Sequence, residues 1–279
     1  MRRVFLLIVF DSSADIRTVA HVDSACAPLK IITVQQEYVD NAQLDIAAMV
    51  EDLAHYKGKS STSCPNPEDW LQAFGDAEQI FCITITGTLS GSYNAACLAK
   101  KLYEEAHPQA QILVINSLST GPEMKLIIEK LQEFILAGLD FDTISKKITK
   151  YQSHTGLLFM LESMRNLANN GRVSTLAAKA AGLLGIRVVG KASDKGDLEP
   201  LDKCRGESNA LSAILSRMKE LGYTGGKVRI AHCFNESAAM KLQNLIKTQF
   251  ANACMQIYPT GGLCSFYAEK GGLLVGFEK

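Results

Sequence analysis

The sequence has few of the features that mark several large classes of protein. Its 29 Lys and Arg residues balance its 29 Asp and Glu residues, so no net charge is available to attract nucleic acid or a membrane surface. No apolar run approaches the ~20 residues that cross a bilayer, so no transmembrane segment is expected. With 47% hydrophobic residues and only 7 prolines, the chain is too apolar to be disordered. The composition indicates a globular protein of 279 residues, close to two average domains.

The eight cysteines lack the spacing of a metal site. No two of them form a C-x-x-C pair, whereas zinc ligands usually occur as two close pairs, so no metal site is expected. Cys82 and Cys97 lie inside apolar runs, where a thiol packs as a small hydrophobic side chain. Unpaired structural cysteines favour a reducing compartment, and we expect a cytoplasmic protein.

In the first half of the chain, apolar strands alternate with amphipathic helices. The N-terminal run stops at Asp11, which is too soon for a signal peptide and typical of a buried strand. Strands are expected at Val4–Phe10, Gln79–Thr86 and Gln111–Ile115, and helices at Asp45–Tyr56, after the cap Asn66, at Ser92–His107 and at Pro122–Leu136. This order predicts an N-terminal α/β domain with a parallel sheet, over residues 1–152.

In the second half of the chain, strands and helices no longer alternate regularly. A strand is expected at Thr155–Met160, followed by a short helix, and another helix is expected after Gly171–Ser174. Strands at Ile186–Val189 and Leu198–Pro200 flank a hairpin turn at Ser193–Asp197. Further helices are expected at Glu207–Leu221 and Glu236–Thr248, and strands at Lys227–His232, Cys254–Tyr258 and Leu273–Phe277. Residues 153–279 are therefore expected to form a C-terminal α+β domain with a smaller mixed sheet.

Hydroxyl and glycine residues follow several of the predicted parallel strands. They occur in Asp11–Asp15, in Gly87–Ser92 directly before a helix, and in Asn116–Gly121. Ligands of parallel sheets bind at the carboxyl ends of the strands, where helix N-termini favour anions. Ser90 and Ser92 therefore suit either a carboxylate or phosphate site or a simple helix cap. The hydroxyl run Ser60–Ser63 is interpreted by itself as a loop before a helix cap.

A serine hydrolase or acyltransferase is the alternative from another class. In the segment Gly87-Thr88-Leu89-Ser90-Gly91, the glycines stand one position earlier relative to the serine than in the nucleophile elbow G-x-S-x-G. Ser90 would be the nucleophile, and His232 at a strand end would be its base.

Five segments together resemble a known family. In chain order they are Asp11-Ser12-Ser13-Ala14-Asp15, Ser61-Thr62-Ser63-Cys64-Pro65, Leu89-Ser90-Gly91-Ser92-Tyr93, Gly171-Arg172-Val173-Ser174 and Gly271-Gly272-Leu273-Leu274-Val275-Gly276-Phe277. They resemble the signature segments of the DegV family of bacterial fatty-acid-binding proteins, over residues 4 to 279. The resemblance implies a two-domain lipid-binding carrier without its own catalytic base and without a cofactor. Its ligand would be one long-chain fatty acid, such as palmitate, presented to the catalytic subunit of a fatty acid kinase for phosphorylation to acyl phosphate.

The resemblance also implies the residues that bind the carboxylate between the two domains. Transferred to this sequence, they are Thr62, Ser63, Ser90, Gly91 and Ser92. Two positions depart from the family pattern: Cys64 stands where Gln is common, and Tyr267 stands where many members have a His that contacts the carboxylate. A Tyr hydroxyl donates a hydrogen bond but carries no positive charge, and we expect Tyr267 to contact the carboxylate in this way or to pack as an interdomain aromatic.

The acyl chain is expected among apolar side chains of the second domain. Candidates lie in runs too apolar for a half-solvated strand, although ordinary core packing accounts equally well for each: Leu157, Phe159, Leu183, Leu184 and Ile186.

Overall fold

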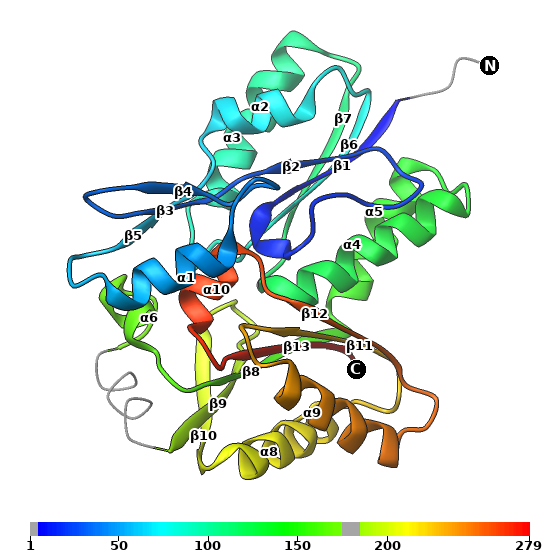
Figure 1. The fold of residues 1–279 in the computed structure, drawn as a ribbon. Coiled ribbons are helices and arrows are strands. Elements are labelled where there is room, and N and C mark those ends of the chain that lie inside the picture. The colour runs from blue at the N-terminus through cyan, green and yellow to red at the C-terminus, as the bar shows by residue number, and fades with distance from the viewer. Residues whose placement is uncertain (1–4, 175–184) are drawn as a thin grey trace.

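A computed structural model describes residues 5–174 and 185–279. Three sheets organise these residues: a four-stranded parallel sheet in the order β2-β1-β6-β7, a six-stranded mixed sheet in the order β10-β9-β8-β13-β11-β12, and a three-stranded sheet in the order β4-β3-β5. Figure 1 shows the two larger sheets in separate halves of the molecule, with helices packed around each. No helix in these described ranges is long and apolar enough to cross a membrane.

The parallel sheet is buried on both faces. Its strands are β1 (Leu6–Asp11), β2 (Ser24–Ala27), β6 (Gln79–Thr84) and β7 (Gln111–Asn116). Because neighbouring residues of a strand point to opposite faces, β1 supplies two cores. Ile8 and Phe10 pack with α4 (Gly121–Leu136) and α5 (Phe141–Gln152), whereas Leu7 and Val9 pack with α2 (Pro67–Phe74) and α3 (Ser92–Ala106).

The mixed sheet is covered on one face by two helices. Its strands are β8 (Thr155–Leu161), β9 (Ile186–Ala192), β10 (Leu198–Arg205), β11 (Lys227–His232), β12 (Cys254–Pro259) and β13 (Leu273–Glu278). Leu158 and Met160 point from β8 into the core beneath α8 (Glu207–Glu220) and α9 (Glu236–Gln249). Leu157, Phe159 and Leu161 point to the opposite face, which is turned toward the N-terminal half.

Smaller elements lie between the two halves. They are η1 (Ser12–Ala14), β3 (Lys30–Ile32), β4 (Glu37–Val39), α1 (Ile46–His55), β5 (Ser61–Ser63), α6 (Arg165–Asn169) and α10 (Gly262–Ala268). The helix α10, drawn in red in Figure 1, packs against η1, β3 and α1 although it belongs to the C-terminal half of the sequence.

The predicted fold class, α/β with a parallel sheet and a separate mixed sheet, is confirmed. The mixed sheet was expected to be the smaller of the two, and this was wrong. It has six strands, more than the parallel sheet, because the β9–β10 hairpin joins β8, β11, β12 and β13 in one sheet. The hydroxyl run at Ser61–Ser63, interpreted as a loop, forms the edge strand β5 against β3. The expected domain boundary between residues 152 and 153 lies between α5 and β8.

Candidate functional site

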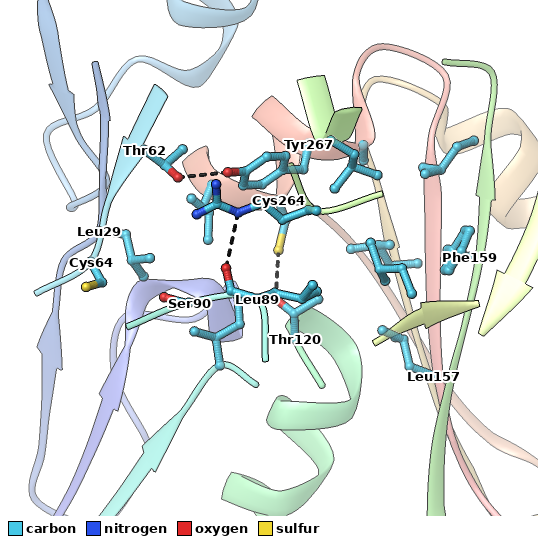
Figure 2. Close-up of a pocket in the computed structure, with 18 of the residues that line it drawn as sticks. Leu29, Thr62, Cys64, Leu89, Ser90, Thr120, Leu157, Phe159, Cys264 and Tyr267 are labelled. Carbon is cyan, nitrogen blue, oxygen red and sulfur yellow. Dashed lines mark hydrogen bonds between the residues drawn. The ribbon is translucent and has the colours of Figure 1, made fainter. Parts of the chain in front are cut away.

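A cavity of about 310 Å³ lies between the two halves of the molecule. Figure 2 shows residues of both halves around it, with Thr62, Cys64 and Ser90 on one side and Leu157 and Phe159 on the other. Its lining comes from seven segments of the chain: Leu29, Thr62, Ser63, Cys64, Ile85, Leu89, Ser90, Gly91, Thr120, Leu157, Phe159, Leu161, Leu167, Arg172, Leu198, Leu263, Cys264, Tyr267, Ala268 and Leu274. This volume is at the lower end of ligand pockets, which measure about 300–1,000 Å³.

One end of the cavity is apolar. Three alternate residues of β8, Leu157, Phe159 and Leu161, form its wall, and each is 3% exposed or less. The ring of Phe159 has room because Gly190 stands opposite it on β9, where a Cβ atom would lie 2.3 Å from the ring. Leu167, Leu198 and Leu274 continue this apolar lining. An end made of leucine and phenylalanine side chains suits a hydrocarbon chain.

Of the residues predicted to enclose the acyl chain, the structure places two at the cavity. Leu157 and Phe159 line it. Ile186, the first residue of β9, is half-buried and is not among the lining residues. Leu183 and Leu184 lie outside the described residues.

The other end of the cavity is polar. It is lined by Thr62 and Ser63 of β5, by Ser90 and Gly91 before α3, and by Tyr267 of α10. The hydroxyl oxygens of Thr62 and Tyr267 are 2.7 Å apart, a hydrogen bond that is drawn in Figure 2. Burial raises the pKa of Tyr267 above its ordinary value, which the hydrogen bond to Thr62 and the charge of Arg172 partly oppose. Tyr267 is therefore a neutral hydroxyl at ordinary pH.

Ser92 occupies a different place from the one predicted. Its hydroxyl is fully buried and donates a hydrogen bond of 2.6 Å to Asp11 at the end of β1, and Ser92 is not among the cavity-lining residues. Asp11 also accepts a hydrogen bond of 2.9 Å from the backbone N–H of Ile85. Burial raises the pKa of Asp11, and these donors counteract the shift. The Ser92 hydroxyl donates to the buried Asp11 and is not available to a ligand in the cavity. Through this hydrogen bond, Ser92 fixes the loop that contains Ser90 to the end of β1.

Ser90 and Gly91 lie at the N-terminus of α3. The first turn of this helix has no conventional side-chain cap, although the Ser90 hydroxyl accepts a long hydrogen bond of 3.3 Å from the backbone N–H of Ser92. Gly91 brings the backbone close to Cys64, since a Cβ atom on it would lie 3.2 Å from the sulfur. Partial burial raises the pKa of the Cys64 thiol, so this sulfur adds no negative charge to the cavity. The positive end of α3 thus opens toward the cavity beside a serine hydroxyl.

Arg172 is a lining residue for which the sequence predicted no role. Its Nε donates a hydrogen bond of 3.1 Å to the carbonyl oxygen of Leu89, and its Nη1 donates to the carbonyl oxygen of Asn170. These acceptors are neutral, and no ion pair of Arg172 with a carboxylate is found in the described ranges. The segment Gly171–Ser174, which contributed to the resemblance, contains the only signal that pointed to this guanidinium.

The structure separates the two residues of the hydrolase alternative. Ser90 lines the cavity, but His232, at the end of β11, does not. The Nδ1 atom of His232 is buried without a hydrogen-bond partner in the described part of the chain, and burial lowers the pKa of this histidine. No histidine is among the described residues that line the cavity. All eight cysteines are free thiols, and three or more metal-ligating side chains do not gather anywhere within residues 5–174 and 185–279.

Comparison with known proteins identifies the family. A family model described as "Uncharacterised protein, DegV family" matches residues 6–279. The chain belongs to the DegV family. A DegV domain-containing protein of Streptococcus gordonii is 46% identical over 275 residues, which cover 97% of this chain and 98% of the relative.

Solved structures of DegV proteins have the same fold. A DegV family protein from Eubacterium eligens, loaded with heptadecanoic acid, superposes with a TM-score of 0.97 at 44% identity, covering 98% of this chain and 99% of the other. The Fatty Acid Kinase (Fak) B3 protein of Streptococcus pneumoniae, loaded with linoleic acid, has the same TM-score and identity and covers 99% of each chain.

Proposed function

We propose that this DegV protein is a carrier that binds one long-chain fatty acid in the cavity between its two halves. The carboxylate lies at the polar end, near Thr62, Ser63, Ser90, Gly91 and Tyr267, with Ser92 supporting the loop through Asp11. The acyl chain lies at the apolar end, between Leu157, Phe159 and their neighbours. The observation that carries the proposal is this cavity with two chemically different ends.

The polar end meets the needs of a buried carboxylate. Such a group needs hydrogen bonds to both oxygens and a compensating charge, because desolvation of an ion is costly. The hydroxyls of Thr62, Tyr267 and Ser90 provide donors, the N-terminus of α3 provides a partial positive charge, and Arg172 provides a full one.

The apolar end supplies the driving force for binding. At ~0.8 kcal/mol for each buried methylene, a chain of about 14 to 18 carbons gains on the order of 10 kcal/mol before the costs of association. Fatty acids in this range, such as palmitate, are therefore the ligands that we propose. The heptadecanoic and linoleic acids in the two relatives with 44% identity support this choice.

We further propose that the protein presents the fatty acid to the catalytic subunit of a fatty acid kinase, in the cytoplasm, and does not itself react with it. The relationship to the pneumococcal Fatty Acid Kinase (Fak) B3 protein supports this partner. The hydrolase or acyltransferase alternative is not favoured, since Ser90 would need a base within hydrogen-bond reach and His232 lies outside the cavity.

The binding proposal is tested by mass spectrometry of an organic extract of the purified protein. We expect one molecule of a fatty acid of about 14 to 18 carbons for each chain, because so large an apolar contact favours retention during purification. Protein from a lipid-containing host that is consistently empty, and that does not take up hexadecanoic acid after delipidation, would contradict the proposal.

The carrier role needs a separate assay. The loaded protein is incubated with ATP and a fatty acid kinase catalytic subunit, and acyl phosphate is trapped with hydroxylamine. We expect hydroxamate only when both proteins are present. Hydrolysis of activated acyl esters by this chain alone, lost in Ser90→Ala, would instead establish the enzyme.

A further inference from the structure

The short helix α10 bridges the two halves of the protein and carries much of the cavity wall. Leu263, Cys264, Tyr267 and Ala268 all line the cavity. The C-terminal end of α10 is anchored in its own half, where the Asn166 side chain of α6 donates a hydrogen bond of 2.8 Å to the carbonyl oxygen of Phe266. Its N-terminal end is anchored in the other half, by carboxylates that the proposed binding site does not include.

Asp40, directly after β4, holds the first turn of α10. Its Oδ1 atom accepts the backbone N–H of Gly262 at 2.9 Å, and its Oδ2 atom accepts the N–H of Leu263 at 3.0 Å. Arg17 forms an ion pair with the same carboxylate. Asp40 is fully buried, and a buried carboxylate with three donors holds its partners in a fixed geometry.

The glycines at the start of α10 allow this close approach. A Cβ atom on Gly262 would lie 2.8 Å from the Oδ1 atom of Asp40 and 2.6 Å from the side chain of Leu44. Asp15 holds the preceding residue in the same manner, since its Oδ1 atom accepts the N–H of Gly261 at 2.8 Å. Three successive backbone N–H groups of the helix start thus donate to Asp side chains of the N-terminal half.

The first turn of α10, which Asp40 holds, lies one helical turn before Tyr267. Residues four apart lie on the same face of a helix, so Tyr267 is stacked directly beyond Leu263. The hydrogen bond of 2.7 Å between Tyr267 and Thr62 joins α10 to β5, an element of the N-terminal half. A shift of α10 by about 1 Å would break this bond, because hydrogen bonds weaken steeply beyond their optimal length.

We propose that Asp40, paired with Arg17, is a positioning residue for the fatty-acid head group: it fixes α10 against the N-terminal half so that the Tyr267 hydroxyl meets Thr62 at the polar end of the cavity. This inference rests on the proposed function, since it concerns the same site. It predicts that Asp40 influences ligand affinity through the Tyr267 hydroxyl.

A double-mutant cycle tests this dependence. Affinity for hexadecanoic acid is measured for delipidated parent, Asp40→Asn, Tyr267→Phe and the double variant. We expect Tyr267→Phe to weaken binding about fivefold, the effect of losing the hydrogen bond between the neutral hydroxyls of Tyr267 and Thr62. Asp40→Asn should weaken binding to a similar extent in the parent, but less than twofold in the Tyr267→Phe background, because the hydroxyl that it positions is already absent.

The control uses an aspartate with the same structural role away from the cavity. Asp140 caps α5 by accepting the N–H of Thr143 at 2.9 Å, and no residue of α5 lines the cavity. Asp140→Asn should leave affinity unchanged in both backgrounds. If Asp40→Asn does not fold, Arg17→Gln replaces it in the cycle, because it removes the ion pair that holds the Asp40 carboxylate in place.

The outcomes separate the two proposals. A parent protein that binds no hexadecanoic acid overturns the proposed function, and the inference with it. A parent that binds tightly, with the same loss from Asp40→Asn in both backgrounds or with no loss in either, overturns the positioning role alone.

Discussion

The hydroxyl oxygens of Tyr267 and Thr62 lie 2.7 Å apart, although 205 positions separate the two residues in the sequence. One hydroxyl donates to the other in this pair, which leaves one hydroxyl proton free to point into the cavity. Such a hydrogen-bonded pair is polarised, so its free proton is a better donor to an anion than an isolated hydroxyl. Tyr267 carries no positive charge in either protonation state, so the positive charge at this end of the cavity comes from Arg172 and from the N-terminus of α3.

The first prediction concerns the hydroxyls of Thr62 and Ser90. A hydrogen bond to a charged group contributes about 1.5–3 kcal/mol, so Thr62→Ala or Ser90→Ala should weaken hexadecanoic acid binding roughly 10- to 150-fold. Titration calorimetry on delipidated protein measures the effect. Thr248→Ala is the matched control, since this hydroxyl lies on α9 and donates to the backbone of its own helix at 2.8 Å. Parent-like affinity in both cavity variants would remove these residues from the site.

The second prediction concerns the charge of Arg172. Arg172→Gln should weaken binding of hexadecanoic acid by about 10-fold or more and should affect hexadecanol much less, because only the acid bears a charge. Competition against a fluorescent fatty acid gives both affinities. Arg165→Gln is the control: the Arg165 side chain is largely exposed, pairs with Glu269 and does not line the cavity. An equal loss for acid and alcohol would mean that Arg172 acts through packing.

The third prediction concerns the apolar end. Leu198 and Leu201 lie on the same strand, β10, but Leu198 lines the cavity and Leu201 packs against the core beneath α8. Leu198→Gln should weaken fatty-acid binding by roughly 1–3 kcal/mol, since it places an unpaired amide beside the methylenes. Leu201→Gln should lower thermal stability and leave affinity at the parent level. A larger loss of affinity in the Leu201 variant would contradict the assignment of the acyl end.

Much of the fold could be predicted because local patterns of apolar residues indicate its strands and helices. The strand β6 and the helix α3 were expected from apolar alternation and periodicity, and both were found within two residues of the expected bounds. The helix α10 was missed, because it is short, begins at Gly262 directly after another glycine, and is held by contacts with residues about 220 to 250 positions away. Short elements that depend on such distant partners leave no periodic signal in their own sequence.

In the candidate site, too, residues within recognisable motifs could be predicted, whereas roles that depend on distant partners could not. Thr62, Ser90 and Tyr267 were named from motifs, and the structure brings them to one cavity. The roles of Ser92 and Arg172 were not apparent, since each depends on a partner that the motif does not contain. For Ser92 this partner is Asp11, and for Arg172 it is the carbonyl oxygen of Leu89.

The fourth prediction concerns the pH dependence of stability at Asp15. Its carboxyl is buried, its Oδ2 atom has no hydrogen-bond partner among the described residues, and burial raises its pKa to about 7 from 3.8. Asp40 lies near and raises this pKa further, whereas the Gly261 N–H, the Cys264 thiol and Arg17 oppose the shift. Between about pH 4 and pH 7 the folded state holds a proton that the unfolded state has lost, so this group makes folding less favourable as pH rises through that window.

Asp15→Asn should therefore gain stability relative to the parent as pH increases from 5 to 8, by roughly 2 to 3 kcal/mol in the free energy of unfolding. Chemical denaturation at several pH values measures this difference, which also cancels the contributions of other buried carboxyls such as Asp11 and Glu123. Asp140→Asn is the control, because the pKa of Asp140 is lowered by its hydrogen bonds to Thr143 and this group stays ionised throughout the window. A difference between Asp15→Asn and the parent that is constant from pH 5 to 8 would show that Asp15 does not titrate there. In that case the pKa of Asp15 in the folded state would lie near or below its ordinary value, which would mean that Arg17 outweighs the cost of burial.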